Sequence, residues 1–209
     1  MPEVARPVIA AFDFDGTLTR RDTLLPFLIR NLGWPRFLCA LLLSSPWLLA
    51  YALRLMSNHQ AKARLLHVSL AGWTQRDAQA RAQAFVTSYL PAQWQPWTLE
   101  QLLEHQRLGH TCIIISASPD LYLHAVAVSL RVDALLCTEM EQQDERYTGA
   151  MASLNCHGEQ KVLRLQAWLQ ANFPHDITPE IHAYGDTKGD LPLLRLADHA
   201  WYRGKPWSA

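Results

Sequence analysis

The apolar residues of the chain occur in short continuous runs that alternate with stretches of helical periodicity. Four runs are typical of buried parallel strands: residues 8–12, 111–115, 132–138 and 181–184. Residues 159–172 repeat apolar side chains at helical spacing, and Pro119 suits the first turn of a second helix over 119–130. Strands that alternate with helices predict an α/β fold, in which a mostly parallel sheet lies between two helical layers in a Rossmann-like three-layer core.

Residues 20–95 break this alternation, because they are rich in Leu, Ala and Trp and contain no β-branched run. We predict a helical insert over 21–95, and a core that is assembled from residues 1–20 and 96–209. A turn is predicted near 142–147, with short extended segments on either side of it.

Residues 37–56 form a long apolar stretch within the insert. At about 20 residues this stretch is long enough to span a membrane. Ser44, Ser45 and Pro46 interrupt it, however, and Arg54 lies near its end. Three interpretations remain open: two short helices packed together within the insert, a surface that contacts lipid, or a membrane span.

The net charge of the chain indicates which classes of partner it can attract. The chain contains 19 Lys and Arg and 19 Asp and Glu, so its formal net charge is zero. No overall field would draw it to nucleic acid, and we predict no nucleic-acid partner. The first residues lack the basic start and the longer apolar stretch of a signal peptide, which predicts a cytoplasmic location. Peripheral membrane association through 37–56 would follow if that segment contacts lipid.

Carboxylates follow the first and the last of the four apolar runs. Asp13 and Asp15 stand at the end of the first run, and Asp186 and Asp190 follow the run at 181–184. Ligands of open parallel sheets bind beyond the carboxyl ends of the strands, so we expect these acids to meet. Crowded carboxylates favour a hard divalent cation, and Mg²⁺ is the expected ion. Either aspartate of the first pair alone would more often be a helix cap, but the pair and the further acids favour a site.

The second apolar run and the helix at 159–172 offer groups that bind anions. Ser116 ends the run and supplies a hydroxyl, and the amides of Ala117 and Ser118 could form an anion-binding turn at a helix start. Lys161 could supply the positive charge that a phosphate requires. Taken alone, Ser116 is a common strand-ending residue and Lys161 a common solvated helix residue.

In order and spacing these residues resemble the motifs of the haloacid dehalogenase superfamily. The four motifs are matched in turn by Asp-Phe-Asp-Gly-Thr at 13–17, by Ser116, by Lys161, and by Gly185-Asp186 with Asp190. The resemblance implies that Asp13 attacks phosphorus and forms an aspartyl phosphate, which water later hydrolyses. It implies that Asp15 protonates the leaving oxygen and then activates the water. Dehalogenase relatives lack this second aspartate and pump relatives carry Thr there, so Asp15 favours a phosphatase.

The resemblance also implies the ligands of the cofactor. Mg²⁺ would be held by the Asp13 carboxylate, by the backbone carbonyl of Asp15 and by Asp186, with Asp190 orienting these groups.

For the phosphate, the resemblance implies that Ser116 and Lys161 hold the phosphoryl oxygens, together with the backbone at Ala117, while Thr17 supports the loop. A regulator of the receiver type also clusters acids, a hydroxyl and a lysine around Mg²⁺. Its phosphorylated aspartate lies at a middle strand, however, whereas here the paired acids close the first strand. The resemblance therefore favours an enzyme.

The insert lies where the superfamily carries a type 1 cap, and its helical character resembles the subfamily of phosphoserine phosphatase. Residues 138–161 resemble most the bacterial branch that contains phosphatidylglycerophosphatase C. Phosphoserine phosphatases usually carry Glu where Asp22 stands, so Asp22 is a candidate for selecting the substrate. We predict a Mg²⁺-dependent phosphomonoester hydrolase whose cap selects a phosphorylated small molecule or a lipid phosphate. Four cap residues remain open between substrate recognition and packing: His59, Lys62, Trp73 and Trp94.

Overall fold

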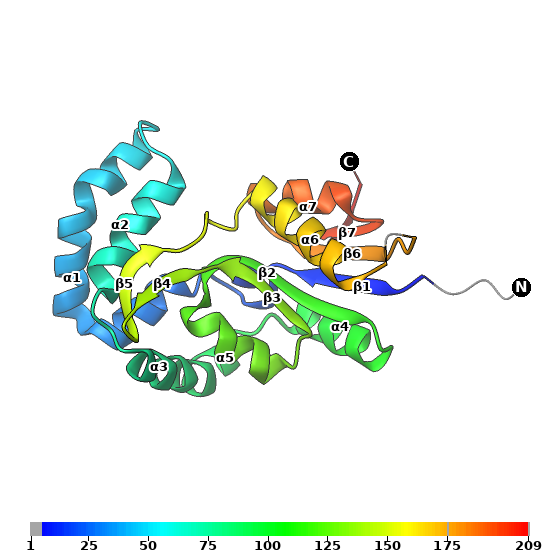
Figure 1. Cartoon of the computed structure of the whole chain (residues 1–209), viewed down its shortest axis with the longest axis horizontal. Coiled ribbons are helices and arrows are strands. Elements are labelled where there is room, and N and C mark those ends of the chain that lie inside the picture. The colour runs from blue at the N-terminus through cyan, green and yellow to red at the C-terminus, as the bar shows by residue number, and fades with distance from the viewer. Residues whose placement is uncertain (1–5, 175, 209) are drawn as a thin grey trace, which may run out of the picture.

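A six-stranded sheet runs through the centre of the core (Figure 1). The computed structural model describes residues 6–174 and 176–208. The strand order is β3-β2-β1-β6-β7-β8, and every pair except β7–β8 is parallel. The strands are β1 Val8–Phe12, β2 Thr111–Pro119, β3 Ala134–Thr138, β6 Glu180–Gly185, β7 His199–Tyr202 and β8 Lys205–Trp207. The predicted mostly parallel sheet is confirmed.

Helices cover both faces of this sheet and complete the three predicted layers (Figure 1). One face carries α6 (Glu159–Asn172) and α7 (Leu191–Leu196), and the other carries α4 (Pro96–Arg107) and α5 (Asp120–Leu130). Along β2, Ile113 and Ile115 pack in the apolar cluster of the first face, whereas Ile114 packs in that of the second. All three are fully buried. Because both faces are covered, the strand is a continuous apolar run rather than an alternating one.

The predicted insert is helical in the structure. α1 (Leu24–Ala52) and α2 (Asn58–Leu70) pack together beyond the end of the sheet, at the left of Figure 1, and α3 (Gln75–Ser88) packs against α5. Three short helical turns complete the chain: η1 Phe14–Leu18, η2 Leu90–Ala92 and η3 Lys188–Asp190. The division of the chain near residues 20 and 95 stays a prediction.

Both ends of the insert lie side by side. The Arg20 amide donates to the Gln93 carbonyl at 2.8 Å, and the Gln95 amide donates to the Leu18 carbonyl at 2.8 Å. The chain therefore leaves the core and returns to it at one place, next to the first sequence motif.

A hairpin from the second half of the chain also contacts the insert. β4 (Met140–Gln143) and β5 (Arg146–Met151) are antiparallel, at the turn predicted near 142–147, and β5 lies against α2. Gly149, at a φ of +83°, permits this contact, because a Cβ there would lie 2.6 Å from the His67 Cα.

The helix α1 overturns one interpretation of residues 37–56, that of two short packed helices. The helix continues through Pro46 to Ala52, and its non-helical residue is Gly33, at a φ of 74°. A proline at 46 cannot donate a hydrogen bond to the carbonyl of Leu42. The Ser45 hydroxyl donates to that carbonyl instead, at 2.7 Å, so the acceptor keeps a partner and the helix is not interrupted.

Much of α1 is also exposed, which contradicts burial within the insert. Leu42 is 71% exposed and Leu49 61%, and in the most apolar window of the helix only 17% of the residues are buried. Within the described residues, α1 is the one helix that is long and apolar enough to cross a membrane, judged by length and composition.

Candidate active site

The carboxyl ends of the three central strands bring the predicted residues together. Asp13 directly follows β1, Ser116 lies near the end of β2, and Asp186 follows β6. The strand order β2-β1-β6 makes these ends neighbours. The Asp13 amide donates to the carbonyl of Tyr184 on β6 at 2.9 Å, which ties the first motif to the fourth.

Lys161 lies between two carboxylates at the start of α6. Its Nζ is 2.5 Å from Asp13 Oδ1 and 2.6 Å from Asp190 Oδ1, and its side chain is 2% exposed. The alternative of a solvated helix lysine is therefore wrong. Burial works against the charged form of Lys161, but the Asp13 and Asp190 carboxylates more than offset it and raise the pKa of the ammonium.

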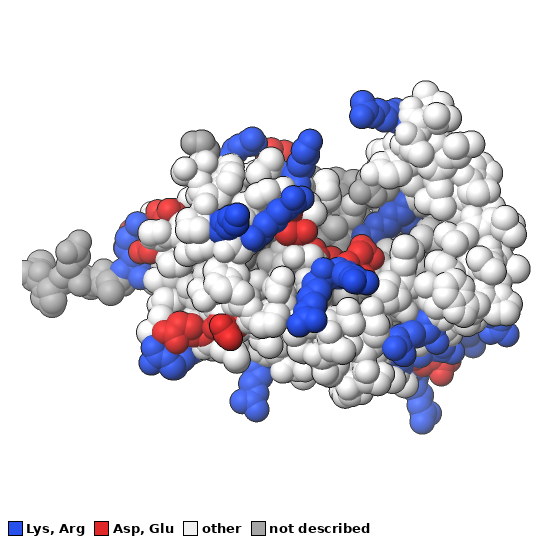
Figure 2. Space-filling model, turned by 180° about the vertical axis from the view of Figure 1, so that it is seen from behind, with Lys and Arg blue, Asp and Glu red and all other residues white. Residues whose placement is uncertain are grey.

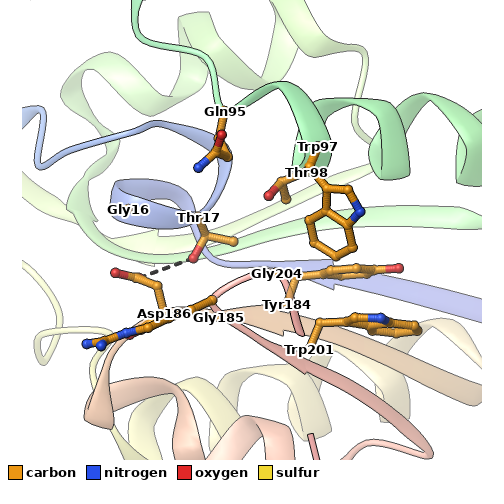
Figure 3. Close-up of a pocket in the computed structure, with 11 residues that line it drawn as sticks. Gly16, Thr17, Gln95, Trp97, Thr98, Tyr184, Gly185, Asp186, Trp201 and Gly204 are labelled. Carbon is orange, nitrogen blue, oxygen red and sulfur yellow. Dashed lines mark hydrogen bonds between the residues drawn. The ribbon is translucent and has the colours of Figure 1, made fainter. Parts of the chain in front are cut away.

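Three carboxylates meet where a cation is predicted. Oxygens of Asp13, Asp186 and Asp190 lie within 4.8 Å of one another. The Thr17 hydroxyl lies 3.1 Å from Asp13 Oδ2 and 3.2 Å from Asp186 Oδ1, the second contact being the dashed line in Figure 3. Burial raises the pKa of Asp13, with Lys161 opposing, and burial and Asp190 raise that of Asp186. An all-oxygen donor set that is costly to ionise fits a hard divalent ion such as Mg²⁺.

Asp190 holds the loop that carries Asp186. Its Oδ2 accepts hydrogen bonds from the Asp186 amide at 3.2 Å, from the Thr187 amide at 2.9 Å and from the Thr187 hydroxyl at 2.7 Å. With its other oxygen on Lys161, this side chain is engaged at both ends. The geometry suits the orienting role that was expected for it.

Asp15 points away from Asp13 into a separate set of partners. Its carboxylate accepts hydrogen bonds from the Thr23 amide at 2.7 Å, from the Thr23 hydroxyl at 2.6 Å and from the Ser118 hydroxyl. Burial and the nearby charge of Asp22 raise the pKa of Asp15 to about 6. A carboxyl group with a pKa near neutrality can give up and take back a proton under physiological conditions.

Gly16 turns the chain immediately after the two aspartates. It adopts a φ of +83°, which L-residues rarely do, and a Cβ at this position would lie 2.3 Å from Asp186 Oδ2. The turn that follows the two aspartates and the approach of the fourth motif therefore both require glycine at residue 16.

The second motif differs in part from the expectation. The Ser116 Oγ accepts a hydrogen bond from the Ser118 amide at 3.0 Å, so this amide has a partner within the turn, and its binding of an anion stays a prediction. The Ala117 carbonyl accepts hydrogen bonds from Lys62 Nζ at 2.7 Å and from the Thr138 hydroxyl at 2.8 Å. The Ser116 hydroxyl can still donate towards a ligand, because its oxygen serves as the acceptor in this turn.

A cavity of about 670 Å³ opens above these residues. Its floor is formed by the motif residues, and its wall towards the insert includes Leu25, Leu48 and Tyr51. Basic side chains line the same space: Arg20, Arg21, Lys62 and Lys161. The cavity thus combines groups that suit a phosphate with an apolar wall that the insert provides.

The candidate cap residues have different surroundings. Asp22 lines the cavity, but its Oδ1 also accepts a hydrogen bond from the Leu24 amide at 3.0 Å, as a helix cap does. Lys62 lines the cavity as well. The Nδ1 of His59 lies 3.3 Å from the Asn155 amide.

The two candidate tryptophans pack against buried aromatic residues. Trp73 packs against Phe27 and beneath the Arg81 guanidinium, and Trp94 packs edge-on against Phe14.

Sequence reasoning missed the hydroxyl of Ser118 as a partner of Asp15, and it missed several residues that the cavity or its acids contact: Thr23, Asn155, His157 and Thr187. Thr23 stands before the apolar run of α1, and Ser118 lies two residues after Ser116. Both are polar residues beside a recognised motif, and that is the one signal the sequence offers for them.

A second cavity of about 460 Å³ shares Gly16 and Asp186 with the first (Figure 3). Its wall includes Trp97, Tyr184 and Trp201. The last two rings are stacked, with 4.6 Å between their centroids.

A parallel α/β sheet whose strand ends gather acids, a hydroxyl and a buried lysine defines the class of hydrolases that use a carboxylate at the first strand. The chain belongs to the haloacid dehalogenase-like hydrolase family, whose model matches residues 10–195. The resemblance read from the motifs is thereby confirmed, and so is the predicted enzyme.

The relatives support the same assignment. The chain is 35% identical over 212 residues to Protein CicA of Caulobacter vibrioides, covering 96% of this chain and 89% of that protein. A crystal structure of a Bordetella pertussis Tohama I protein of unknown function has a TM-score of 0.79 at 22% identity, covering 94% of this chain and 89% of the other. A substrate-bound phosphoserine phosphatase has a TM-score of 0.58 at 15% identity, covering 96% and 87%. The chain thus shares its fold with phosphoserine phosphatase.

Proposed function

We propose that this hydrolase cleaves phosphomonoesters with Mg²⁺ as its cofactor, through an aspartyl phosphate on Asp13. The observation that carries the proposal is the setting of the Asp13 carboxylate. It lies at the carboxyl end of β1, contacts Lys161 and Thr17, and lines the cavity. A carboxylate held at a cavity floor beside a buried cation can act as a nucleophile towards phosphorus.

The first half-reaction transfers the phosphoryl group to the protein. An Asp13 oxygen forms a bond to phosphorus, the bond from phosphorus to the ester oxygen breaks, and protonated Asp15 gives its proton to that oxygen. Lys161 and the Ser116 hydroxyl would stabilise the charge that develops on the phosphoryl oxygens.

The second half-reaction returns Asp13 to its initial state. Asp15, now ionised, takes a proton from water while the water oxygen bonds to phosphorus and the bond to Asp13 breaks. Inorganic phosphate leaves, and Asp15 is again protonated. One residue thus serves as acid and then as base, and its pKa of about 6 suits both tasks.

Asp13, Asp186 and the backbone carbonyl of Asp15 would hold the ion. Mg²⁺, when bound, offsets charge on the transferred phosphoryl group and favours the ionised form of the nucleophile. Asp190 would keep the Asp186 loop in place through the hydrogen bonds to its backbone. Removal of divalent ions with a chelator should therefore abolish turnover, and Mg²⁺ should restore it.

Asp13→Asn tests the nucleophile. The variant should lose Mg²⁺-dependent hydrolysis of a simple aryl phosphate and should not incorporate labelled phosphate from the substrate. Asp77→Asn, which changes an exposed acid in the first turn of α3, is the matched control and should retain full activity. Substantial activity in the Asp13 variant would exclude this residue as the nucleophile.

A lipid phosphate is the second candidate for the substrate, and the exposed apolar face of α1 favours it. Leu48 and Tyr51 line the cavity, while Leu42 and Leu49 on the same helix are exposed. Figure 2 shows the α1–α2 region, at the right, with few charged side chains, whereas basic and acidic side chains gather over the core and in the hollow beside it. A helix of this kind can lie in a lipid interface and bring a lipid phosphate to the cavity.

Turnover on liposomes tests this candidate. If the substrate is a phosphatidylglycerophosphate-like lipid, Leu42→Ser with Leu49→Ser should weaken liposome binding and lipid hydrolysis and leave hydrolysis of a soluble aryl phosphate unchanged. Leu103→Ser, at a leucine of α4 that is 55% exposed, is the matched control. Phosphoserine or another soluble phosphoester hydrolysed efficiently, with no turnover of lipid, would instead assign a small-molecule substrate. The predicted cytoplasmic location stays a prediction in either case.

A further inference from the structure

Three potential metal ligands lie at the amino ends of β6 and β7, at the opposite end of these strands from the candidate active site. Glu180 is the first residue of β6, His182 follows it by two, and His199 is the first residue of β7. Residues two apart in a strand share one face of the sheet. His182 and His199 are direct partners in the parallel register, so the sheet itself places all three side chains together.

The three ligand atoms converge on one point. His182 Nε2 lies 2.9 Å from Glu180 Oε1, and His199 Nε2 lies 3.1 Å from the same oxygen. All three atoms lie within 4.8 Å of one another. Around a tetrahedral zinc ion, with bonds of about 2.0–2.2 Å, ligand atoms stand roughly 3.4 Å apart. The two carboxylate–imidazole distances lie a few tenths of an ångström short of this spacing.

Packing restrains the rings that would bind. The His182 ring lies 4.6 Å from His199, 5.7 Å from Trp201 and 5.1 Å from His105 on α4, measured between ring centroids. His182 is 17% exposed, whereas His199 is 55% exposed. The inner ligand is thus fixed by the core, and the outer one leaves an open side for the ion to enter and for water to complete the shell.

The chemistry of the donors distinguishes this cluster from the acids at the other end of the sheet. Two imidazoles and one carboxylate suit zinc and neighbouring transition metals, whereas Mg²⁺ prefers an all-oxygen set. A metal ion binds imidazole in its neutral form and a carboxylate in its ionised form. A single divalent ion would therefore satisfy the carboxylate without charging the rings.

We infer that Glu180, His182 and His199 form a second metal site, for a zinc-type ion, separate from the Mg²⁺ site and independent of the proposed phosphatase mechanism. The ion would join the first residues of two adjacent strands. β6 leads at its other end directly into the Asp186 loop, so the site would restrain the strand pair that carries the fourth motif.

Metal binding by the untagged full-length protein tests this inference. After treatment with a chelator and dialysis, Zn²⁺ is titrated calorimetrically in excess Mg²⁺, and the bound metal is counted by elemental analysis. We expect one zinc ion per chain and a rise in the melting temperature with Zn²⁺. His199→Ala and Glu180→Gln should weaken binding at least about tenfold, since even the loss of groups behind the ligands costs that much. Cobalt in place of zinc should give the visible absorption of a tetrahedral site.

Two controls make the result decisive. His124→Ala, at an exposed histidine of α5, should bind zinc as the unchanged protein does. Asp13→Asn, at the other metal site, should do so as well, which separates failure of this inference from failure of the proposed function. Binding that survives His199→Ala and Glu180→Gln, or that is lost with Asp13→Asn, would overturn the inference, as would the absence of a zinc ion at stoichiometric concentrations. Circular dichroism of the metal-free variants checks that each is folded.

Discussion

The central sheet and α1 are both rich in apolar residues, but they use them differently. In β2 the residues Ile113, Ile114 and Ile115 are fully buried between helical layers. In α1, by contrast, Leu42 and Leu49 are mostly exposed. The apolar side chains of the sheet stabilise the fold, whereas an exposed apolar helix is typical of a surface that binds a protein or a membrane. Equal hydrophobicity therefore has different functional meaning in the two regions.

Substitution of one lysine in each region should give the largest difference in stability between the core and the insert. Lys161→Met should lower the free energy of unfolding by about 3–5 kcal/mol, because Asp13 and Asp190 would lose their buried partner. Because the pKa of Lys161 is raised, this contribution is present below the pKa of the unfolded side chain, about 10.4, as long as the partner carboxylates are ionised. It is lost as pH rises through the still higher folded value.

Lys62→Met, in the insert, should cost less than about 1 kcal/mol, since it removes a hydrogen bond to Ala117 and a charge that burial disfavours. Burial lowers the pKa of Lys62, so the folded protein favours its charge less than water does. Urea unfolding at neutral pH without divalent ions measures both variants. A loss of stability in Lys161→Met as small as that expected for Lys62→Met would mean that the Lys161 contacts do not stabilise the core.

Truncation of one apolar residue in each region tests the comparison directly. Ile114→Ala should cost about 2–5 kcal/mol, because it removes a fully buried side chain and leaves a cavity. Leu42→Ala should change stability by no more than about 0.5 kcal/mol, since the leucine is already 71% exposed. Chemical unfolding of both variants gives the values. A large loss of stability in Leu42→Ala would show that this face of α1 is buried in solution. It would contradict the proposal that the face contacts lipid.

Alanine substitutions at two glycines with nearly the same φ distinguish the effect of backbone strain from that of a displaced active-site residue. Gly16→Ala should lower kcat/KM about 100-fold, or about 2.7 kcal/mol, because the new methyl group would displace Asp186. Gly72 in the insert has a φ of +85°, but no neighbour lies within 4 Å of the Cβ that Gly72→Ala would add. It should therefore lower the melting temperature and leave kinetics unchanged. Similar kinetics for the two variants would show that Asp186 tolerates displacement.

The smallest expected effect concerns pH. With a pKa near 6, about one tenth of Asp15 is ionised at pH 5, so hydrolysis of the phosphoenzyme should slow roughly tenfold there. Its formation needs protonated Asp15 and is favoured at the same pH. Phosphoenzyme should therefore accumulate below pH 6 and decline above it in acid-quenched reactions with labelled substrate. An amount that does not vary with pH would mean that another group is the base.

Much of the core could be predicted from the sequence, because its signals are local. The run 111–115 is apolar without alternation, which is typical of a strand covered on both faces. Parallel topology then brings Asp13 and Asp186 together at one end, although they are far apart in sequence. The hydrogen bond from the Ser118 amide to the Ser116 hydroxyl could not be predicted, because the sequence does not encode the orientation of that hydroxyl.

The insert was harder to predict, because its signals depend on tertiary context. Pro46 indicated a break, but the Ser45 hydroxyl partners the carbonyl that the proline leaves free. The sequence also did not decide whether α1 is exposed, since the same apolar residues suit a helix covered by protein and a helix covered by lipid. The Glu180, His182 and His199 cluster was not predicted, because the pairing of β6 with β7 creates it.

The pairing of Leu18 and Arg20 with Gln95 and Gln93 bears on how the protein could diversify. Because the chain departs and returns at one point, the intervening segment can lengthen or shorten with little entropic penalty, about 0.6 kcal/mol for each doubling of a flexible loop. The core beyond that point would keep its strand register. Descendants of one ancestral hydrolase could thus exchange this segment and acquire new substrates while inheriting the same chemistry.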